Sequence, residues 1–183
     1  MKIWMMVAGC VLVAGLGLGS GSALAAGPVA VADAAGDGKA LMIAVTVPAS
    51  QAEVWKAFST QAGLSTWLAP DTTVDLKPGG DWLVHFPGGS TGGGTIVSFV
   101  PEKEIVIAAL APDKFPTVRA QRTRARFEFE SHGGSTVVRL TQTGWKDGAE
   151  WDRAYEYLTA GNAQLLAALY HRFVHGPTDW SKE

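Results

Sequence analysis

Few side chains in this 183-residue chain have the types and spacing that catalysis or metal binding requires. His171 and His175 are one helical turn apart, but no glutamate completes the His-Glu-x-x-His pattern of a zinc site around them. Both histidines lie at the end of a predicted helix, where the helix dipole favours cationic side chains. We interpret them as a solvated helix end and predict neither a metal site nor a cofactor.

A glycine-rich run, Pro87 to Gly94, resembles a phosphate-binding loop only in its composition. A P-loop needs a lysine followed by serine or threonine, with a helix directly after it, and both are missing here. We therefore expect a mobile hairpin loop, placed to gate a cavity. Four arginines between Arg119 and Arg126 are interpreted as a solvated strand edge rather than an anion site, because Glu128 and Glu130 follow them.

Gln142 is the one polar residue that the alternation of the final predicted strand turns inward. A buried amide must find hydrogen-bond partners, which leaves two alternatives, an oxygen of a ligand or a backbone group. Three tyrosines offer hydroxyls, but no acid–base pair with a tuned pKa emerges from the pattern. We therefore predict no catalytic residue.

The N-terminus has the features of a signal peptide, predicted over residues 1–25. Lys2 is the only charge before Asp33, an apolar run follows it, and Ala23-Leu24-Ala25 matches a signal-peptidase site. A membrane anchor and lipidation at Cys10 are the competing interpretations. Cleavage after Ala25 predicts a periplasmic or secreted protein with no stable membrane insertion afterwards.

The mature chain must rely on a hydrophobic core, because its only cysteine, Cys10, leaves with the signal peptide. Its remaining length of ~158 residues suffices for one such domain. Its mildly acidic balance predicts no nucleic-acid partner and no attraction to anionic lipid. We expect a flexible leader over residues 26–39, one domain over residues 40–175, and a tail over residues 176–183.

Hydrophobic periodicity predicts one strand, two short helices, six further strands and a long final helix. Ser50 and Glu53 form a capping box at the first helix, and Asp147 with Glu150 form a second one at the last helix. Gly161 lies inside that last helix, where glycine costs ~1 kcal/mol relative to alanine. It indicates either close backbone packing or a lining position kept empty. The strands are expected at 41–47, 73–76, 82–86, 95–100, 105–110, 124–130 and 136–142, and the helices at 51–63, 64–68 and 150–174.

This order of elements and several of its motifs resemble the START-like (SRPBCC) superfamily. The branch that it resembles is the one named after the activator of the ninety-kilodalton heat-shock protein's ATPase. The motifs are the opening Val47 to Trp55, Gly79-Gly80, the run from Gly94 to Val106, and Gly144-Trp145 with the helix that follows. The resemblance covers about residues 40–173. It implies an α+β helix-grip fold, a curved antiparallel sheet of about seven strands around the long C-terminal helix.

What the resemblance implies about function is a cavity for apolar ligands between sheet and helix. Members range from lipid and sterol carriers to aromatases and cyclases, whereas the chaperone-linked members work beside a cytosolic partner that an exported protein would not meet. We predict binding of a small apolar or amphipathic ligand. A cyclase- or aromatase-type enzyme using the same cavity, or a protein-interaction module with a protein partner, are the alternatives.

The candidate ligand-binding residues combine strand alternation with the aromatic residues expected to close the ends of the cavity. The alternation of the strand predicted at 95–100 also turns Val97 inward. Asn162 falls on the apolar stripe of the last helix. The predicted site comprises Trp67, Trp82, Val84, Phe86, Phe99, Phe127, Phe129, Leu140, Gln142, Trp145, Tyr155 and Leu158.

Overall fold

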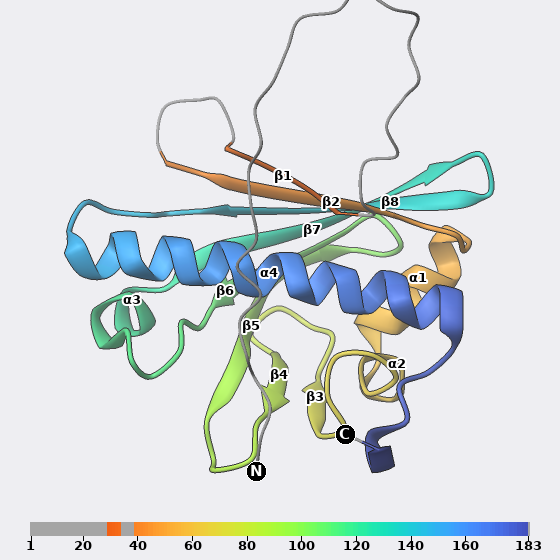
Figure 1. Cartoon of the computed structure of the whole chain (residues 1–183), viewed down its shortest axis with the longest axis horizontal. Helices are drawn as coiled ribbons and strands as arrows, with labels where there is room; N and C mark the ends of the chain where they lie inside the picture. Colours follow the sequence, from red (N-terminus) through yellow and green to blue (C-terminus); the bar gives the residue numbers. More distant parts are fainter. Residues whose placement is uncertain (1–28, 34–38, 183) are drawn as a thin grey trace, which may run out of the picture.

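The computed structural model describes residues 29–33 and 39–182, so the predicted signal peptide lies outside the described residues. The described chain forms an eight-stranded sheet in the order β1-β2-β8-β7-β6-β5-β4-β3, and every neighbouring pair is antiparallel. A long C-terminal helix, α4, lies across one face of this sheet, as Figure 1 shows. The predicted α+β helix-grip fold is therefore confirmed.

The elements follow the predicted order, with three additions, β1, α3 and η1. The strands are β1 Val29–Asp33, β2 Leu41–Val47, β3 Thr72–Val74, β4 Asp81–His85, β5 Thr91–Val100, β6 Glu104–Ala109, β7 Thr123–His132 and β8 Ser135–Thr143. The helices are α1 Gln51–Ser59, α2 Gln61–Leu64, α3 Pro116–Gln121 and α4 Ala149–His175, followed by the short 3-10 helix η1 Trp180–Lys182. In Figure 1, α3 lies near the start of α4, and α1 and α2 lie near its end. No helix in the described part of the chain is long and apolar enough to cross a membrane.

Strand β1 corrects the prediction of a flexible leader over residues 26–39. It pairs with β2 from Val29 opposite Val45 to Asp33 opposite Leu41, and it makes eight strands where about seven were expected. The leader's alanines and glycines indicated a flexible segment, and two alternating valines, Val29 and Val31, are too short a pattern to indicate a strand alone. Pairing with the edge of β2 supplies the backbone hydrogen bonds that make it one.

The two predicted capping boxes have opposite outcomes. Ser50 caps α1, because its hydroxyl accepts from the Glu53 amide while the Glu53 carboxylate accepts from the Ser50 amide at 3.1 Å. The prediction for α4 is wrong: its N-cap is Gly148, with no side-chain cap. Glu150 instead accepts hydrogen bonds from the amides of Thr117 and Val118, at 2.7 Å and 3.1 Å. It therefore fastens α3, a helix that the periodicity missed, to the first turn of α4.

A β-bulge in β5 corrects the predicted direction of Val97. Ile96 pairs with Ile107 and Ser98 with Val106, so the register shifts between them. Ile96 is 1% exposed on the inner face, whereas Val97 is 38% exposed. The extra residue restores Phe99 to the inner face opposite Ile105, because a bulge reverses the alternation after it. The glycine-rich run is also shorter as a loop than predicted, since Thr91 to Gly94 already belong to β5.

The sheet's inner face is filled by aromatic rings where α1 covers it. The Phe58 ring of α1 lies 5.2 Å from Phe127 and 5.0 Å from both Phe129 and Trp67, measured between centroids. The indole N–H groups of Trp67 and Trp82 donate to the carbonyls of Ala57 and Phe58, at 3.0 Å and 2.9 Å. These bonds satisfy both buried indoles. This half of the sandwich between sheet and helices is therefore solid core.

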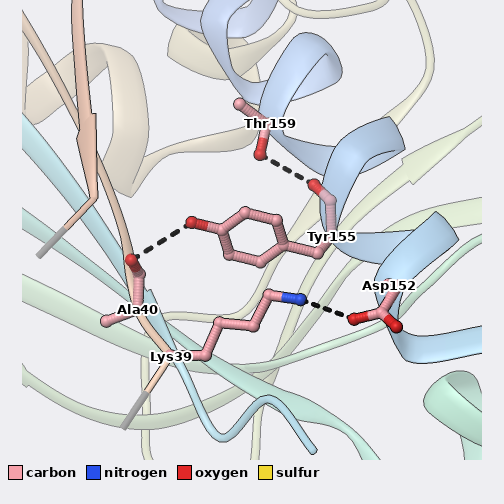
Figure 2. A network of polar contacts seen from close by, with 5 residues as sticks. All are labelled: Lys39, Ala40, Asp152, Tyr155 and Thr159. Carbon is pink, nitrogen blue, oxygen red and sulfur yellow. Dashed lines mark hydrogen bonds and ion pairs between the residues drawn. The ribbon is translucent and has the colours of Figure 1, made fainter. Parts of the chain in front are cut away.

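A polar network near the start of β2 joins the sheet to α4 (Figure 2). The Tyr155 hydroxyl donates to the carbonyl of Ala40 at 3.3 Å, and Lys39 pairs with Asp152 at 2.7 Å. The Lys39 ammonium also lies 4.5 Å from the centre of the Tyr155 ring. Thr159 closes the network by donating to the Tyr155 carbonyl at 2.7 Å. These contacts position the first half of α4 over the sheet.

Candidate functional site

The other half of the inner face encloses a cavity of about 970 Å³ between β4–β8 and α4. Its walls are mainly apolar, and several of the residues that line it on the sheet and on α4 are small. Strand β5 contributes Gly92 and Gly93, β6 contributes Ala109, β7 contributes Ala125, and α4 contributes Gly161. Because these residues have little or no side chain, the space that aromatic rings fill beside α1 stays open here.

Gly93 shows why β5 carries glycines beside the cavity. Its φ angle is +92°, a conformation that costs other residues strain, and an added Cβ would collide with the Trp82 carbonyl on β4. At Gly161 the situation is the reverse, since a Cβ built there meets no atom within 4 Å. Of the two alternatives for Gly161, the structure therefore supports the lining position kept empty. The glycine widens the cavity rather than allowing close packing.

Eight of the twelve predicted site residues line this cavity. They are Trp67, Trp82, Val84, Phe86, Phe127, Leu140, Gln142 and Leu158. Six lie on the strands or directly after β4, as alternation indicated. Trp67 comes from the turn between α2 and β3, and Leu158 comes from α4. Phe86 remains 48% exposed at the end of β4, so it lies at the rim.

The other four predicted residues lie elsewhere. Phe99 and Phe129 pack on Trp55, with ring centroids 6.5 Å and 5.6 Å away, inside the solid half of the core. Trp145 and Tyr155 pack edge to face at 5.0 Å. Tyr155 is held by the network in Figure 2, and Trp145 belongs to a second buried cluster with Phe115 and Trp151. Apart from Val97 at the bulge, alternation identified the inner face of the strands correctly, but it does not tell which part of that face is filled.

The polar part of the cavity wall is built around the side chain of Gln142, which is 2% exposed. Its Nε2 atom donates to the Thr123 hydroxyl at 2.7 Å, and its Oε1 atom accepts from Nδ2 of Asn162 at 2.8 Å. Both partners are side chains, so of the two alternatives the backbone group is wrong, and contact with a ligand oxygen stays a prediction. Asn162 also lines the cavity. It could have been found, because it interrupts the apolar stripe of α4 with an amide facing the sheet.

Charged side chains gather at the rim, beside the segment that leads into α3. The Lys114 ammonium lies 3.4 Å from the centre of the Tyr157 ring, and Asp113 pairs with Arg119 at 3.0 Å. Arg119 also donates to the Thr91 hydroxyl at 3.1 Å, which connects this segment to β5. The arginine run is therefore not one continuous strand edge, since its first member belongs to α3 and supports the rim.

The C-terminal tail covers one end of the cavity, although the sequence gave no signal for this. Thr178 and Trp180 are among its lining residues. The Thr178 amide donates to the carbonyl of Thr66 at 2.9 Å, and the Trp180 indole donates to the carbonyl of Ser65 at 2.7 Å. The tail is thereby attached to the turn between α2 and β3.

Comparison with known protein families identifies the family of this chain. The family model described as "Activator of Hsp90 ATPase homolog 1-like protein" matches residues 48–173. The chain belongs to this family. Its predicted relationship to the activator branch of the SRPBCC superfamily is thus confirmed. A comparison with curated proteins finds no match.

Solved structures similar to this AHSA1-family chain share its fold at low sequence identity. The Aha1 dimer from Colwellia psychrerythraea is 20% identical with a TM-score of 0.61, covering 75% of this chain and 97% of that one. CalU16 from Micromonospora echinospora is 18% identical with a TM-score of 0.58, covering 82% and 84%. Protein MLL2253 from Mesorhizobium loti is 17% identical with a TM-score of 0.59, covering 71% and 94%.

The lining of this AHSA1-family cavity can bind and orient a molecule. Among the described residues that line it, no hydrogen-bonded pair of nucleophile and base occurs. His171 lies at the rim with its ring 4.5 Å from that of His175, and no cluster of three or more potential metal ligands occurs in the described part of the chain. The arrangement offers apolar walls, aromatic faces and one buried amide pair.

Proposed function

We propose that this protein is exported and binds a small apolar or amphipathic molecule in the cavity between its sheet and α4. The observation that carries the proposal is the cavity of about 970 Å³, lined by Trp67, Trp82, Phe127 and Leu140 and holding the polar side chain of Gln142. Ligand pockets typically have volumes of ~300–1,000 Å³, apolar walls and a few well-placed polar groups.

The cost of the cavity supports the same proposal. Protein interiors are close-packed, whereas this cavity opens to solvent at its rim and leaves apolar wall surface unburied that a filled core would cover. Here the space results from small residues on four separate elements, including a helical glycine at position 161 that itself lowers helix stability. A bound molecule would supply the missing contacts and offset these costs.

The proposed export rests on the N-terminal segment, which has the composition of a cleaved signal peptide. We therefore do not extend to this chain the chaperone-linked role that the family description names. DynU16, a putative protein in the dynemicin biosynthetic locus, shares the fold at 15% identity with a TM-score of 0.59. That level of identity supports a common fold, so the ligand class must come from this cavity.

The binding proposal is tested with a neutral apolar probe, N-phenyl-1-naphthylamine, whose fluorescence rises in apolar surroundings. We expect saturable binding to the purified chain. Replacing Gly161 with phenylalanine places a ring in the open space around that position, which should weaken probe binding by about tenfold or more. Native mass spectrometry of protein from its own host would then show whether a defined small molecule is carried.

The matched control is Gly161→Ala, which adds only a methyl group to the same position. It should bind the probe like the unmodified chain and be more stable by up to ~1 kcal/mol, because alanine is the better helix former. Equal binding by the phenylalanine and alanine variants would contradict the proposal. Turnover of an aromatic polyketone would favour the cyclase-type enzyme, and a stable protein complex with an empty cavity would favour the interaction module.

A further inference from the structure

The amide pair Gln142–Asn162 has hydrogen-bonding capacity that the described residues do not use. Each primary amide carries two N–H donors and a carbonyl oxygen with two lone pairs. The bonds to Thr123 and between the two amides occupy one N–H and one lone pair of Gln142, and one N–H of Asn162. In the described part of the chain, the Asn162 carbonyl oxygen accepts no hydrogen bond. Both residues line the cavity, so a bound molecule is within their reach.

A hydroxyl group is the ligand group that suits this pair best. An amide in a protein can be turned over, which exchanges its N–H and carbonyl positions. Thr123 can either accept or donate, so the chain of bonds from Thr123 through Gln142 to Asn162 can run in both directions. A hydroxyl both donates and accepts, and it therefore meets whichever group Asn162 presents. A ketone or an ammonium group meets only one of the two.

The remaining walls favour a neutral and largely aromatic body for the same ligand. The flat rings of Trp82 and Phe127, from the sheet, and of Trp67, from the turn between α2 and β3, all line the cavity. The charged lining residues lie at the rim, where Asp113 is paired with Arg119 and Lys114 covers the Tyr157 ring. A carboxylate or ammonium group placed deep in the cavity would have no partner of opposite charge among the described lining residues, and its desolvation would oppose binding.

From these observations we infer that Gln142 and Asn162 form the polar subsite of the cavity and that this subsite receives a hydroxyl group of a neutral, aromatic ligand, a phenol or aryl alcohol. The inference rests on the proposed binding function and specifies its ligand class. Gln142 is fixed by Thr123 and acts as the positioning residue, while Asn162 contacts the ligand.

The test uses two probes that differ only in one hydroxyl, 1-naphthol and naphthalene. Each is titrated into the full chain preloaded with N-phenyl-1-naphthylamine, and its displacement of that reporter is measured at neutral pH, where 1-naphthol is uncharged. We expect 1-naphthol to bind about tenfold more tightly than naphthalene, as one well-formed buried hydrogen bond allows. In the variant Asn162→Leu the two probes should bind with about equal affinity, while naphthalene binding is retained or improved.

A second variant keeps the test valid if Asn162→Leu is unstable because it leaves the Gln142 carbonyl without a partner. The triple variant Thr123→Val, Gln142→Leu and Asn162→Leu removes the whole hydrogen-bonded chain, which is less disruptive than leaving one buried member without a partner. It should bind naphthalene and show no preference for 1-naphthol. Asn162→Ser, which keeps a hydroxyl donor and acceptor, should retain part of the preference.

The outcomes separate the two proposals. If both probes displace the reporter with equal affinity from the unmodified chain, the hydroxyl subsite is wrong and the binding function stands. The same conclusion follows if the preference persists unchanged in both leucine variants. If neither probe nor the reporter binds, the binding function itself fails, and the subsite fails with it.

Discussion

At the scale of single residues, the hydroxyl of Thr123 decides whether the buried amide of Gln142 is satisfied. Thr123 is 4% exposed and accepts from Gln142 at 2.7 Å. Replacing it with valine keeps the shape but removes the acceptor, so a buried N–H loses its partner. We expect Thr123→Val to lower the free energy of unfolding by about 1–3 kcal/mol, measured by urea denaturation.

Two controls separate the hydrogen bond from the substitution as such. Thr123→Ser keeps the hydroxyl and should recover most of the loss. Thr143→Val makes the same chemical change at an exposed position of β8 and should alter stability by less than ~0.5 kcal/mol. If Thr123→Val is as stable as the Thr143 variant, the hydroxyl does not hold Gln142.

Residue types alone predicted part of this site. The inward direction of Gln142 followed from the alternation of β8, which has no bulge in its pairing with β7 or β2. Its partners could not be read in the same way, because Thr123 and Asn162 are 19 and 20 residues away in sequence. Only the antiparallel register, with Ala125 opposite Gln142, and the course of α4 bring them together.

At the scale of elements, regular strands were predictable and their irregularities were not. Alternation located β2, β7 and β8 closely, but the bulge at Val97 left no mark on the sequence pattern because Ile96, Val97 and Phe99 are all apolar. Glycines misled in the opposite direction. The run Gly92 to Gly94 suggests a loop by composition, yet it belongs to the start of β5, where close contact with β4 at Gly93 and with β6 at Gly94 excludes side chains.

Helix α3 was missed because its N-terminus is satisfied from a distant part of the chain. Its N-cap, Phe115, makes no side-chain capping bond, and the free amides of its first turn donate to Glu150 instead. A local capping signal is therefore absent, and six residues are too few for a clear helical period. The same carboxylate explains the wrong prediction for α4, since Glu150 faces α3 rather than its own N-cap.

This contact predicts a pH dependence for the packing of α3 on α4. Partial burial acts to raise the pKa of Glu150, but hydrogen bonds from the amides of Val118 and Thr117 outweigh it and lower the pKa below the ordinary value of 4.5. A depressed pKa means that the folded state binds fewer protons than the unfolded state. The resulting stabilisation is present above pH 4.5 and is lost as the pH falls through the lower, folded-state pKa.

The variant Glu150→Gln should therefore be less stable than the unmodified chain at neutral pH, and the difference should shrink below pH 4.5. Urea unfolding at a series of pH values measures it, and amide hydrogen exchange at Thr117 and Val118 reports on α3 directly. Glu156→Gln, an exposed change on the same helix, is the control. A constant difference between Glu150→Gln and the unmodified chain down to pH 3 would show that ionisation of Glu150 does not fasten α3.

At the scale of the whole molecule, the division of the inner face into a filled and an open half is what creates the site. Rings from α1, β7 and the turn before β3 fill one half, as the Phe58–Phe127 and Phe58–Trp67 contacts show. The open half depends on small residues from β5, β6, β7 and α4 that meet only in the folded state. The sequence order predicted that sheet and helix would face each other. It did not predict where their side chains would fail to meet.

The C-terminal tail covers one end of the cavity, and its removal should speed the dissociation of a bound molecule. Thr178 and Trp180 line one end and are held by the carbonyls of Thr66 and Ser65. A chain ending at Gly176 should release N-phenyl-1-naphthylamine roughly several-fold faster, with little change in its association rate, because lost contacts act mainly on dissociation. Stopped-flow fluorescence measures both rates.

Trp180→Ala should reproduce most of the effect, and Lys182→Ala, an exposed change in the same tail, should not. Unchanged dissociation from the truncated chain would mean that the tail covers the cavity without retaining what it holds.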